Sequence, residues 1–196
     1  MSMPGHAIGN VTSEIPPYDV LAGKDGYEIR RYQKQLWAQI TYEVPLNTEF
    51  MSEMGTGFFP LHKYIFGNNI SGTIIPMTAP VIIQEITDNQ VIKRTMTFIM
   101  SPSRFSSLDQ LPIAIDTNIR MVEEPNTRDV ACITFNMTMT HEKNATKEQE
   151  LREAAHRDGL ILSSDRNDVM YFGYNPPFTI PYFRRNEICI PIVAQQ

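Results

Sequence analysis

The chain has 196 residues, a formal net charge of −5 and a hydrophobic fraction of 42%, which is long and apolar enough to bury a core. No run of residues approaches the ~18 apolar positions that a membrane-spanning helix needs. No cluster of lysine and arginine is long enough to follow a phosphate backbone. The composition therefore disfavours a membrane-spanning protein and a nucleic-acid-binding protein.

Residues 1–14 are small and polar without periodicity, which predicts a flexible N-terminal arm before a single domain at 15–196. Residues 36–44 alternate apolar and polar side chains, as expected of a half-buried strand. Residues 27–32 form another candidate strand, and the link at 33–35 predicts a hairpin turn between the two.

Residues 47–67 predict the first helix. Asn47 or Thr48 can cap its start, and Gly67 suits the left-handed position after its end. One apolar stripe provides a core face. A second stripe lies about 100° further round, and it comprises Met51, Gly55, Phe59, His62 and Phe66. Either the helix is wedged between the sheet and a loop, or the second stripe forms an apolar groove for a ligand.

A stiff segment follows this helix. Pro76 and Pro80 bracket Met77-Thr78-Ala79 and push the residues before them toward extended geometry. Met77 either lines a binding region or plugs one end of the fold, because a thioether fills irregular apolar space well. An aliphatic run starts at Val81.

The second half repeats this organisation. Candidate strands at 118–124 and 129–139 predict a hairpin across Pro125-Asn126, after a strand within 90–100 and a loop at 101–117. The capping-box pattern Thr146-Lys-Glu-Gln149 predicts the start of a second helix that ends at Gly159. Strands at 169–174 and 187–193 close the chain. The duplicated order of strands and helices predicts an α+β fold in which antiparallel sheets curl into a barrel-like body flanked by two helices.

Motifs for catalysis are missing from the sequence. There is no nucleophile elbow, phosphate-binding loop or dinucleotide fingerprint, and the four histidines lack zinc-site spacing. We therefore predict a protein that is not an enzyme.

Cysteines and glycosylation motifs bear on the cellular compartment. Cys132 and Cys189 are either free thiols or one bridge, and the first 17 residues lack the features of a signal peptide. We expect a cytoplasmic protein. An extracellular one, with a leader removed, is the alternative because the acceptor pattern for N-linked glycans occurs at Asn10, Asn69, Asn136 and Asn144. Asn136 falls inside a predicted strand, where a glycan would be awkward.

Four ordered motifs resemble the SOUL/haem-binding protein family. They are YEIRRY (27–32), TGFFPLHKYIFGNN (56–69), MTAPV (77–81) and GYNPPFTIPYFRRNEICI (173–190), and the likeness runs from Tyr18 to Val193. The resemblance implies a pseudo-two-fold pair of β-α-β-β units forming a distorted antiparallel β-barrel flanked by two helices. It also implies non-covalent binding of haem or another porphyrin, as a carrier, buffer or sensor, without a known reaction.

The resemblance places the pocket on the first helix and on the loop between the last two strands. Together with Met77, the residues carried over are Met54, Phe58, His62, Lys63, Phe178 and Arg184. Aromatic and thioether side chains can cover the porphyrin disc. Lys63 and Arg184 can pair with its propionates, and His62 can ligate the iron or form pocket wall.

Two other readings remain open. Some members of the family have been linked to apoptosis through a BH3-like helix, and the comparable segment here is residues 151–165. A BH3 helix places apolar anchors along one face, which Leu151, Ala155 and Asp158 match poorly. The third reading is a carrier of another small apolar ligand.

Overall fold

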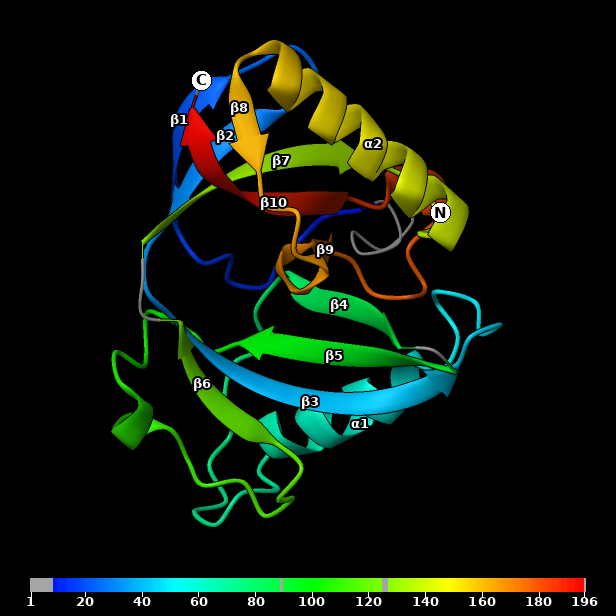
Figure 1. Ribbon diagram of the computed structural model, residues 1–196. Coiled ribbons are helices and arrows are strands. Elements are labelled where there is room, and N and C mark those ends of the chain that lie inside the picture. Colours follow the sequence, from blue (N-terminus) through cyan, green and yellow to red (C-terminus); the bar gives the residue numbers. More distant parts are fainter. Residues whose placement is uncertain (1–8, 89, 125–126, 196) are drawn as a thin grey trace, which may run out of the picture. The chain divides into compact units, whose positions relative to one another are not determined.

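The computed structural model describes residues 9–88, 90–124 and 127–195. The chain divides into two compact units, and Figure 1 colours them along the sequence. Unit 1 comprises Met1–Thr12, Pro17–Gln33 and Thr127–Gln196, and unit 2 comprises Ser13–Pro16 and Lys34–Asn126. Each unit is an antiparallel sheet with one long helix.

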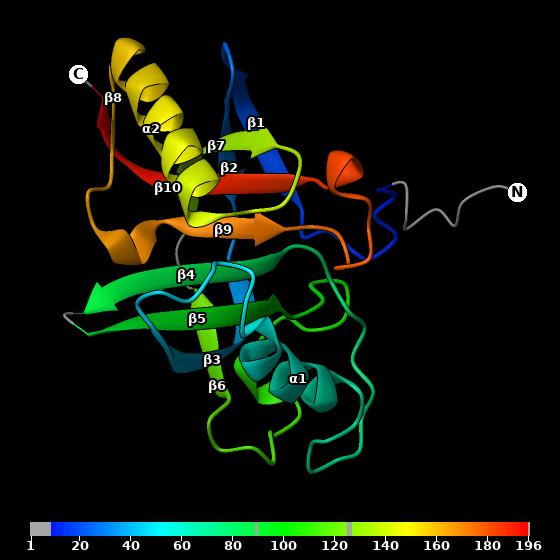
Figure 2. The same cartoon turned by 90° about the vertical axis from the view of Figure 1, so that its right-hand side faces the viewer.

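In unit 2 the strands pair in the order β4-β5-β3-β6. Figure 2 shows the helix α1 against this sheet, where it packs on β3 and β5. The elements are β3 (Gln35–Pro45), α1 (Met54–Ile65), β4 (Val81–Asp88), β5 (Val91–Ile99), the 3₁₀ turn η2 (Leu108–Gln110) and β6 (Arg120–Glu124).

The alternation predicted for residues 36–44, which lie in β3, is confirmed. Every second residue of β3 from Leu36 to Val44 faces the core or its edge, whereas Thr41 and Glu43 are exposed. Met96 and Phe98 of β5 and the inner face of α1 pack with these β3 side chains in one cluster. The period-2 pattern of β3 therefore decides which face of this strand is buried. The cluster's most buried members are Ala38, Leu61, Tyr64, Ile65, Ile75, Met96, Phe98 and Met100.

In unit 1 the strands pair in the order β1-β2-β7-β10-β9, and β8 pairs with β10. The helix α2 packs against β7, β8 and β10, as Figure 1 shows. The elements are β1 (Tyr18–Gly23), β2 (Glu28–Tyr32), β7 (Arg128–Phe135), α2 (His141–Arg157), β8 (Leu160–Leu162), η3 (Arg166–Asp168), β9 (Met170–Gly173), η4 (Pro181–Phe183) and β10 (Asn186–Gln195).

The two units repeat one order of elements along the chain. Unit 2 runs β3, α1, β4, β5, and unit 1 runs β7, α2, β9, β10 with the short β8 before β9. The α+β class, the antiparallel strands and the duplicated β-α-β-β order are therefore confirmed.

Both predicted hairpins are wrong. β2 pairs with β1 and β7, whereas β3 pairs with β5 and β6. Likewise β6 pairs with β3 and β7 with β2 and β10. The links at 33–34 and 126–127 are the places where the chain passes from one unit to the other, so strands that are neighbours in sequence belong to different units. Pro125 and Asn126 themselves lie outside the described residues.

The predicted starts of both helices are also wrong. α1 begins at Met54 rather than near Thr48, after Glu53 in the left-handed region with φ 57°, and no side chain caps it. α2 begins at His141, because the Thr140 side chain accepts a hydrogen bond from the Lys143 amide. Thr146 lies inside α2, where its hydroxyl donates to the Glu142 carbonyl. The ends were predicted correctly, since Gly67 (φ 99°) and Gly159 (φ 76°) follow them.

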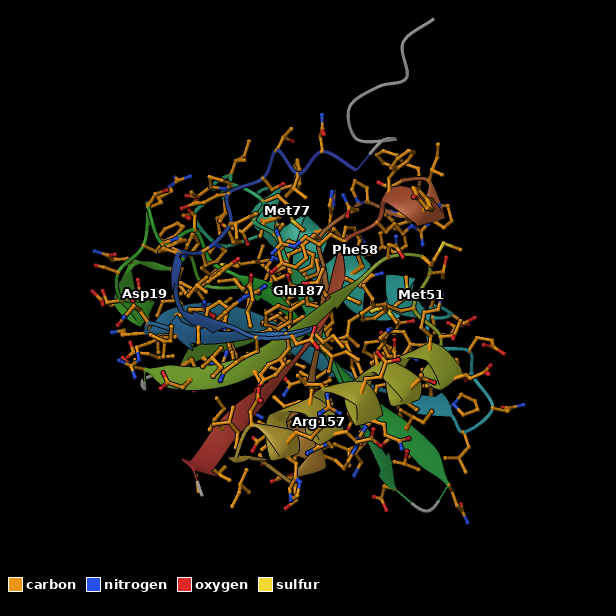
Figure 3. The ribbon with its side chains drawn as sticks, turned by 90° about the horizontal axis from the view of Figure 1, so that it is seen from above. Asp19, Met51, Phe58, Met77, Arg157 and Glu187 are labelled. Atoms are coloured by element: carbon orange, nitrogen blue, oxygen red, sulfur yellow. A yellow bond between two sulfur atoms is a disulfide. The ribbon has the colours of Figure 1, made fainter. Side chains whose placement is uncertain are left out.

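Unit 1 contains a buried carboxylate, Glu187, which Figure 3 labels. Arg30 donates to it at 2.6 and 3.1 Å, Arg185 at 2.6 and 2.9 Å and the Tyr174 hydroxyl at 2.8 Å. Burial alone would raise the pKa of Glu187, but the hydrogen bonds and charges of Arg30 and Arg185 outweigh it and lower the pKa. Glu187 is therefore ionised in the folded protein at neutral pH.

Cys132 and Cys189 form a disulfide in unit 1. They are directly opposite each other in the register of β7 and β10, with their Cα atoms 4.2 Å apart, and both are buried. Of the two possibilities that the sequence left open, the structure has the bridge.

Candidate ligand-binding site

The helix α1 has one buried face and one open apolar face. Leu61, Tyr64 and Ile65 are buried in the core of unit 2. On the other side, Phe59 is 62% exposed and Phe66 is 59% exposed. The second apolar stripe is thus uncovered at both phenylalanines, which is unusual for a helix packed on a sheet.

Three rings stack along this open side. The His62 ring lies 4.3 Å from the Phe66 ring, with an angle of 20° between their planes. Phe58 lies on the other side of His62 at 5.5 Å and 30°. These residues are four positions apart, so the helix itself brings them together. We call Phe58, Phe59, His62 and Phe66 the aromatic face.

Two glycines serve the helix in different ways. A Cβ on Gly57 would lie 2.6 Å from the ring of Tyr42 and 3.0 Å from Cβ of Met96. Gly57 therefore lets α1 approach β3 and β5 closely. A Cβ on Gly55 would lie 2.8 Å from the ring of Phe59, so Gly55 leaves room for Phe59 to lie back over the helix.

Four exposed isoleucines extend the apolar surface of unit 2 beyond the helix end. Phe66 and Ile74 form an isolated antiparallel bridge, and the Ile70 amide donates to the Ile113 carbonyl. The buried Asn69 side chain holds the loop by donating to the Tyr64 and Thr73 carbonyls. The isoleucines are Ile70, Ile74, Ile113 and Ile115.

Met54, Phe58 and Met77 are half-buried and pack against the core of unit 2. Phe58 and Met77 are labelled in Figure 3. The segment that carries Met77 is fixed from both sides, because the Thr78 hydroxyl donates to the Ile99 carbonyl at 2.5 Å and the Ala79 amide donates to the Glu14 carbonyl at 2.9 Å. The two prolines predict a stiff segment here, and these two hydrogen bonds constrain it further.

The two predicted propionate partners differ in their surroundings. Lys63 is exposed on α1. Arg184 belongs to unit 1 and donates to the carbonyls of Thr179 at 2.9 Å and Pro177 at 2.6 Å, and to the Thr138 hydroxyl at 3.3 Å. Arg184 therefore holds the loop between β9 and β10, which also carries the 69%-exposed Phe178. Its role toward a ligand stays a prediction.

The residues carried over from the family resemblance do not include Phe59, Phe66 or the four isoleucines. A signal for the phenylalanines was present, because they belong to the second stripe of the helix. Ile113 and Ile115 gave a weaker signal, since two isoleucines spaced by two in a loop show only that both share one side of an extended backbone.

Among residues 9–88, 90–124 and 127–195, no group of three or more histidine, cysteine, aspartate or glutamate side chains could hold a metal ion. No helix in the described part of the chain is long and apolar enough to cross a membrane.

Solved structures of similar fold share little sequence with this chain. The C-terminal domain of EcmrR matches with a TM-score of 0.57 and 12% identity, covering 85% of this chain and 98% of that one. An uncharacterized conserved protein from Listeria innocua matches with a TM-score of 0.65 at 9% identity, and a protein described as a hydrolase from Listeria innocua with 0.59 at 10%. Each match covers 88% of this chain and 94% of the other. At these identities the likeness shows the fold alone.

A search of curated proteins found no significant match. The family model described as SOUL heme-binding protein matches residues 13–191, which is nearly the whole chain. The chain therefore belongs to the SOUL haem-binding protein family.

Proposed function

We propose that the protein binds haem or a related tetrapyrrole non-covalently on the aromatic face of α1, as a carrier, buffer or sensor. The observation that carries the proposal is the exposure of Phe59 and Phe66 beside the half-buried rings of Phe58 and His62. An apolar disc that covers these rings would remove their surface from water, at roughly 25 cal/mol per Å².

The residues present fit the chemistry of a porphyrin. Its macrocycle is apolar and aromatic, and it would meet rings, thioethers and isoleucines. Its propionates are anionic, and Lys63 on the last turn of α1 offers an exposed ammonium group. Met54 and Met77 add polarizable contacts that adapt to a flat ligand.

His62 also fits an iron atom. Its ring is half-buried, stacks on Phe66 at 4.3 Å and lies 5.5 Å from Phe58. A neutral imidazole nitrogen would supply an axial bond to haem iron when haem is bound. His62 can equally serve as apolar wall, and metal-free porphyrin separates the two roles.

Titration with ferric haem and with protoporphyrin IX tests the proposal. We expect saturable binding of one molecule per chain, with a dissociation constant of micromolar order or tighter, about −8 kcal/mol. Phe59→Ser/Phe66→Ser should weaken both ligands at least tenfold and leave the melting temperature nearly unchanged, because both side chains are exposed. Leu21→Ser, at an exposed site in unit 1, is the matched control. No saturable Soret change in the unmodified chain would refute the proposal.

The His62→Ala variant then tests whether His62 is an axial ligand of the haem iron. A shifted Soret maximum, with haem weakened much more than protoporphyrin IX, shows ligation. Equal weakening of both ligands shows that His62 is wall. Tighter binding of an unrelated apolar dye than of either porphyrin would favour a carrier of another small ligand.

The alternative of a BH3-like helix gains no support from α2. Leu151 and Ala155 are fully buried in unit 1, so they would have to leave the core before the helix could enter the groove of a partner. A pull-down with a pro-survival groove protein remains the test of that reading.

A further inference from the structure

Neither the fold nor the proposed function explains the four acceptor motifs for N-linked glycans. The four asparagines differ in how exposed they are in the structure. The side chains of Asn69 and Asn144 are each 2% exposed. Asn10 and Asn136 are exposed. A glycan is a large, hydrated group that must remain on the surface, so the four motifs are not equivalent in the folded chain.

Asn69 is unsuited to modification for a chemical reason. Its Nδ2 atom donates one hydrogen bond to the Tyr64 carbonyl at 3.0 Å and another to the Thr73 carbonyl at 2.7 Å. Glycosylation replaces one Nδ2 hydrogen with a bond to carbon, so one of these buried carbonyls would lose its donor. The loss of this hydrogen bond is unfavourable, and the steric cost of the sugar adds to it.

Asn144 is unsuited for a reason of packing. It lies on the inner face of α2, on the same stripe as the fully buried Leu151 and Ala155. A sugar there would separate the helix from the sheet of unit 1.

Asn136 lies outside the strand in which the sequence placed it. β7 ends at Phe135, and Asn136 is the first residue after it. The following residue is fixed, because the Met137 amide donates to the Pro181 carbonyl and the Asn186 side chain donates to the Met137 carbonyl, both at 2.8 Å. The backbone beside Asn136 is therefore held from within, and its exposed side chain can carry a glycan without loss of a contact.

Asn10 is similarly placed. The carbonyl of the residue before it, Gly9, accepts a hydrogen bond from Asn175 at 3.0 Å. The chain is thus tied to unit 1 one residue before an asparagine that is itself exposed.

The disulfide is the independent observation that points to the compartment. Cys132 and Cys189 are opposite each other and buried, so their bond forms while the chain folds in an oxidising environment. Such environments include the lumen of the endoplasmic reticulum, where N-linked glycans are attached. The pairing favours the extracellular alternative over the cytoplasmic location expected from the N-terminal residues.

We propose that the mature protein carries N-linked glycans on Asn10 and Asn136, and none on Asn69 or Asn144. The donor is an oligosaccharide on a lipid diphosphate. The asparagine Nδ2 forms a bond to the sugar's anomeric carbon, the bond from that carbon to the diphosphate breaks, and one amide proton is released. Transfer precedes folding, so chains modified at Asn69 or Asn144 fail to reach the folded state.

The test uses the full chain purified from its native source. A peptide N-glycosidase removes the glycan and leaves aspartate at each modified asparagine, which peptide mass spectrometry locates. We expect aspartate at positions 10 and 136 only, and no free thiol on Cys132 or Cys189 after denaturation without reductant. A glycan-free chain, or aspartate at position 69 or 144 in folded protein, overturns the proposal.

Variants expressed through the secretory route of eukaryotic cells sharpen the assignment. Asn10→Gln and Asn136→Gln should each remove one glycan, and the double variant should remove both. Thr138→Ser keeps the acceptor pattern and should keep the glycan, whereas Thr138→Ala should lose it. Ser71→Ala and Thr146→Ala delete the buried motifs and should leave the glycan mass of the folded protein unchanged. A loss of glycan in either of these two variants contradicts the proposal.

Discussion

The aromatic face of unit 2 and the Glu187 cluster of unit 1 are opposite kinds of region. The cluster gathers charged groups, which are common at functional sites. However, Arg30, Arg185, Tyr174 and Thr134 all donate to the carboxylate of Glu187. The aromatic face consists mainly of phenylalanines, which are typical of a hydrophobic core, yet Phe59 and Phe66 are exposed. The satisfied charges indicate a structural role for the Glu187 cluster, and the exposed rings are the basis on which we propose a binding role for the aromatic face.

The two helices show the same contrast. α1 presents rings to solvent, whereas the outer surface of α2 carries ion pairs such as Lys147–Glu150 at 2.6 Å. Both helices occupy the same place in the repeated order of elements. The binding role that we propose therefore depends on the residues of one helix face and not on the repeated fold.

The largest expected effect on stability comes from removing the charge of Glu187. Glu187→Gln removes the fully buried counter-charge that Arg30 and Arg185 share and leaves Arg30, which is 2% exposed, paired with Glu28 alone at 2.8 Å. It should lower the free energy of unfolding by about 3–5 kcal/mol in urea titrations. Glu123→Gln removes the half-buried partner of the exposed Lys34, at a similar distance of 2.8 Å, and should cost about 0–1 kcal/mol. Equal costs for the two variants would show that the cluster is not specially stabilising.

The same cluster predicts how stability changes with pH. The pKa of Glu187 is lower in the folded chain than its ordinary value of 4.5, so the unfolded chain takes up the proton first as the pH falls. The stabilisation from Glu187 is present above pH 4.5 and is lost as the pH falls from there through the lower folded pKa. Urea titrations between neutral and acidic pH should show a shallower loss for Glu187→Gln than for the unmodified chain. Porphyrin affinity at neutral pH should not change in this variant, because the Glu187 cluster belongs to unit 1 and contains no residue of the aromatic face.

A smaller effect on stability is expected from replacing the two glycines of α1 with alanine, and it should differ between them. Gly57→Ala places a methyl group against Tyr42 and Met96, and overpacking of this kind should cost about 1–3 kcal/mol. Gly55→Ala meets only the ring of the exposed Phe59, which can move, so stability should stay level or rise by up to about 1 kcal/mol from helix propensity. Thermal melts measure both changes.

The same pair tests the aromatic face. Gly55→Ala should weaken porphyrin binding although the protein becomes no less stable, because Phe59 is displaced. If Gly55→Ala binds porphyrin as the unmodified chain does, the position of Phe59 does not matter for binding.

The smallest effect concerns the segment of Met77. Pro76 is exposed, and Pro76→Ala should cost about 0.4–1 kcal/mol by loosening the unfolded chain. If a preformed Met77 wall contributes to binding, porphyrin affinity should also fall in the folded variant. Met77→Ala should weaken binding through lost contact area. Normal binding by both variants would make the segment a structural plug that serves the fold alone.

The sequence by itself determined the types of the main elements and the buried faces of β3 and α1. Side-chain alternation and helical spacing are local properties, and they survive folding. It also determined where α1 and α2 end, because Gly67 and Gly159 take the left-handed backbone that glycine adopts easily. The family motifs in turn fixed the expected ligand class.

Only the tertiary structure decided the pairing of strands, since the short links at 33–34 and 126–127 resemble turns and yet pass between units. It also decided that Thr140 rather than Thr146 caps α2, because both threonines can cap a helix and the sequence pattern does not choose between them. Exposure is likewise a tertiary property. On α1, the apolar side chain of Leu61 is buried and that of Phe59 is exposed. Asn69 is buried, whereas Asn136 is exposed. Two cysteines far apart in sequence face each other because β7 and β10 are neighbours.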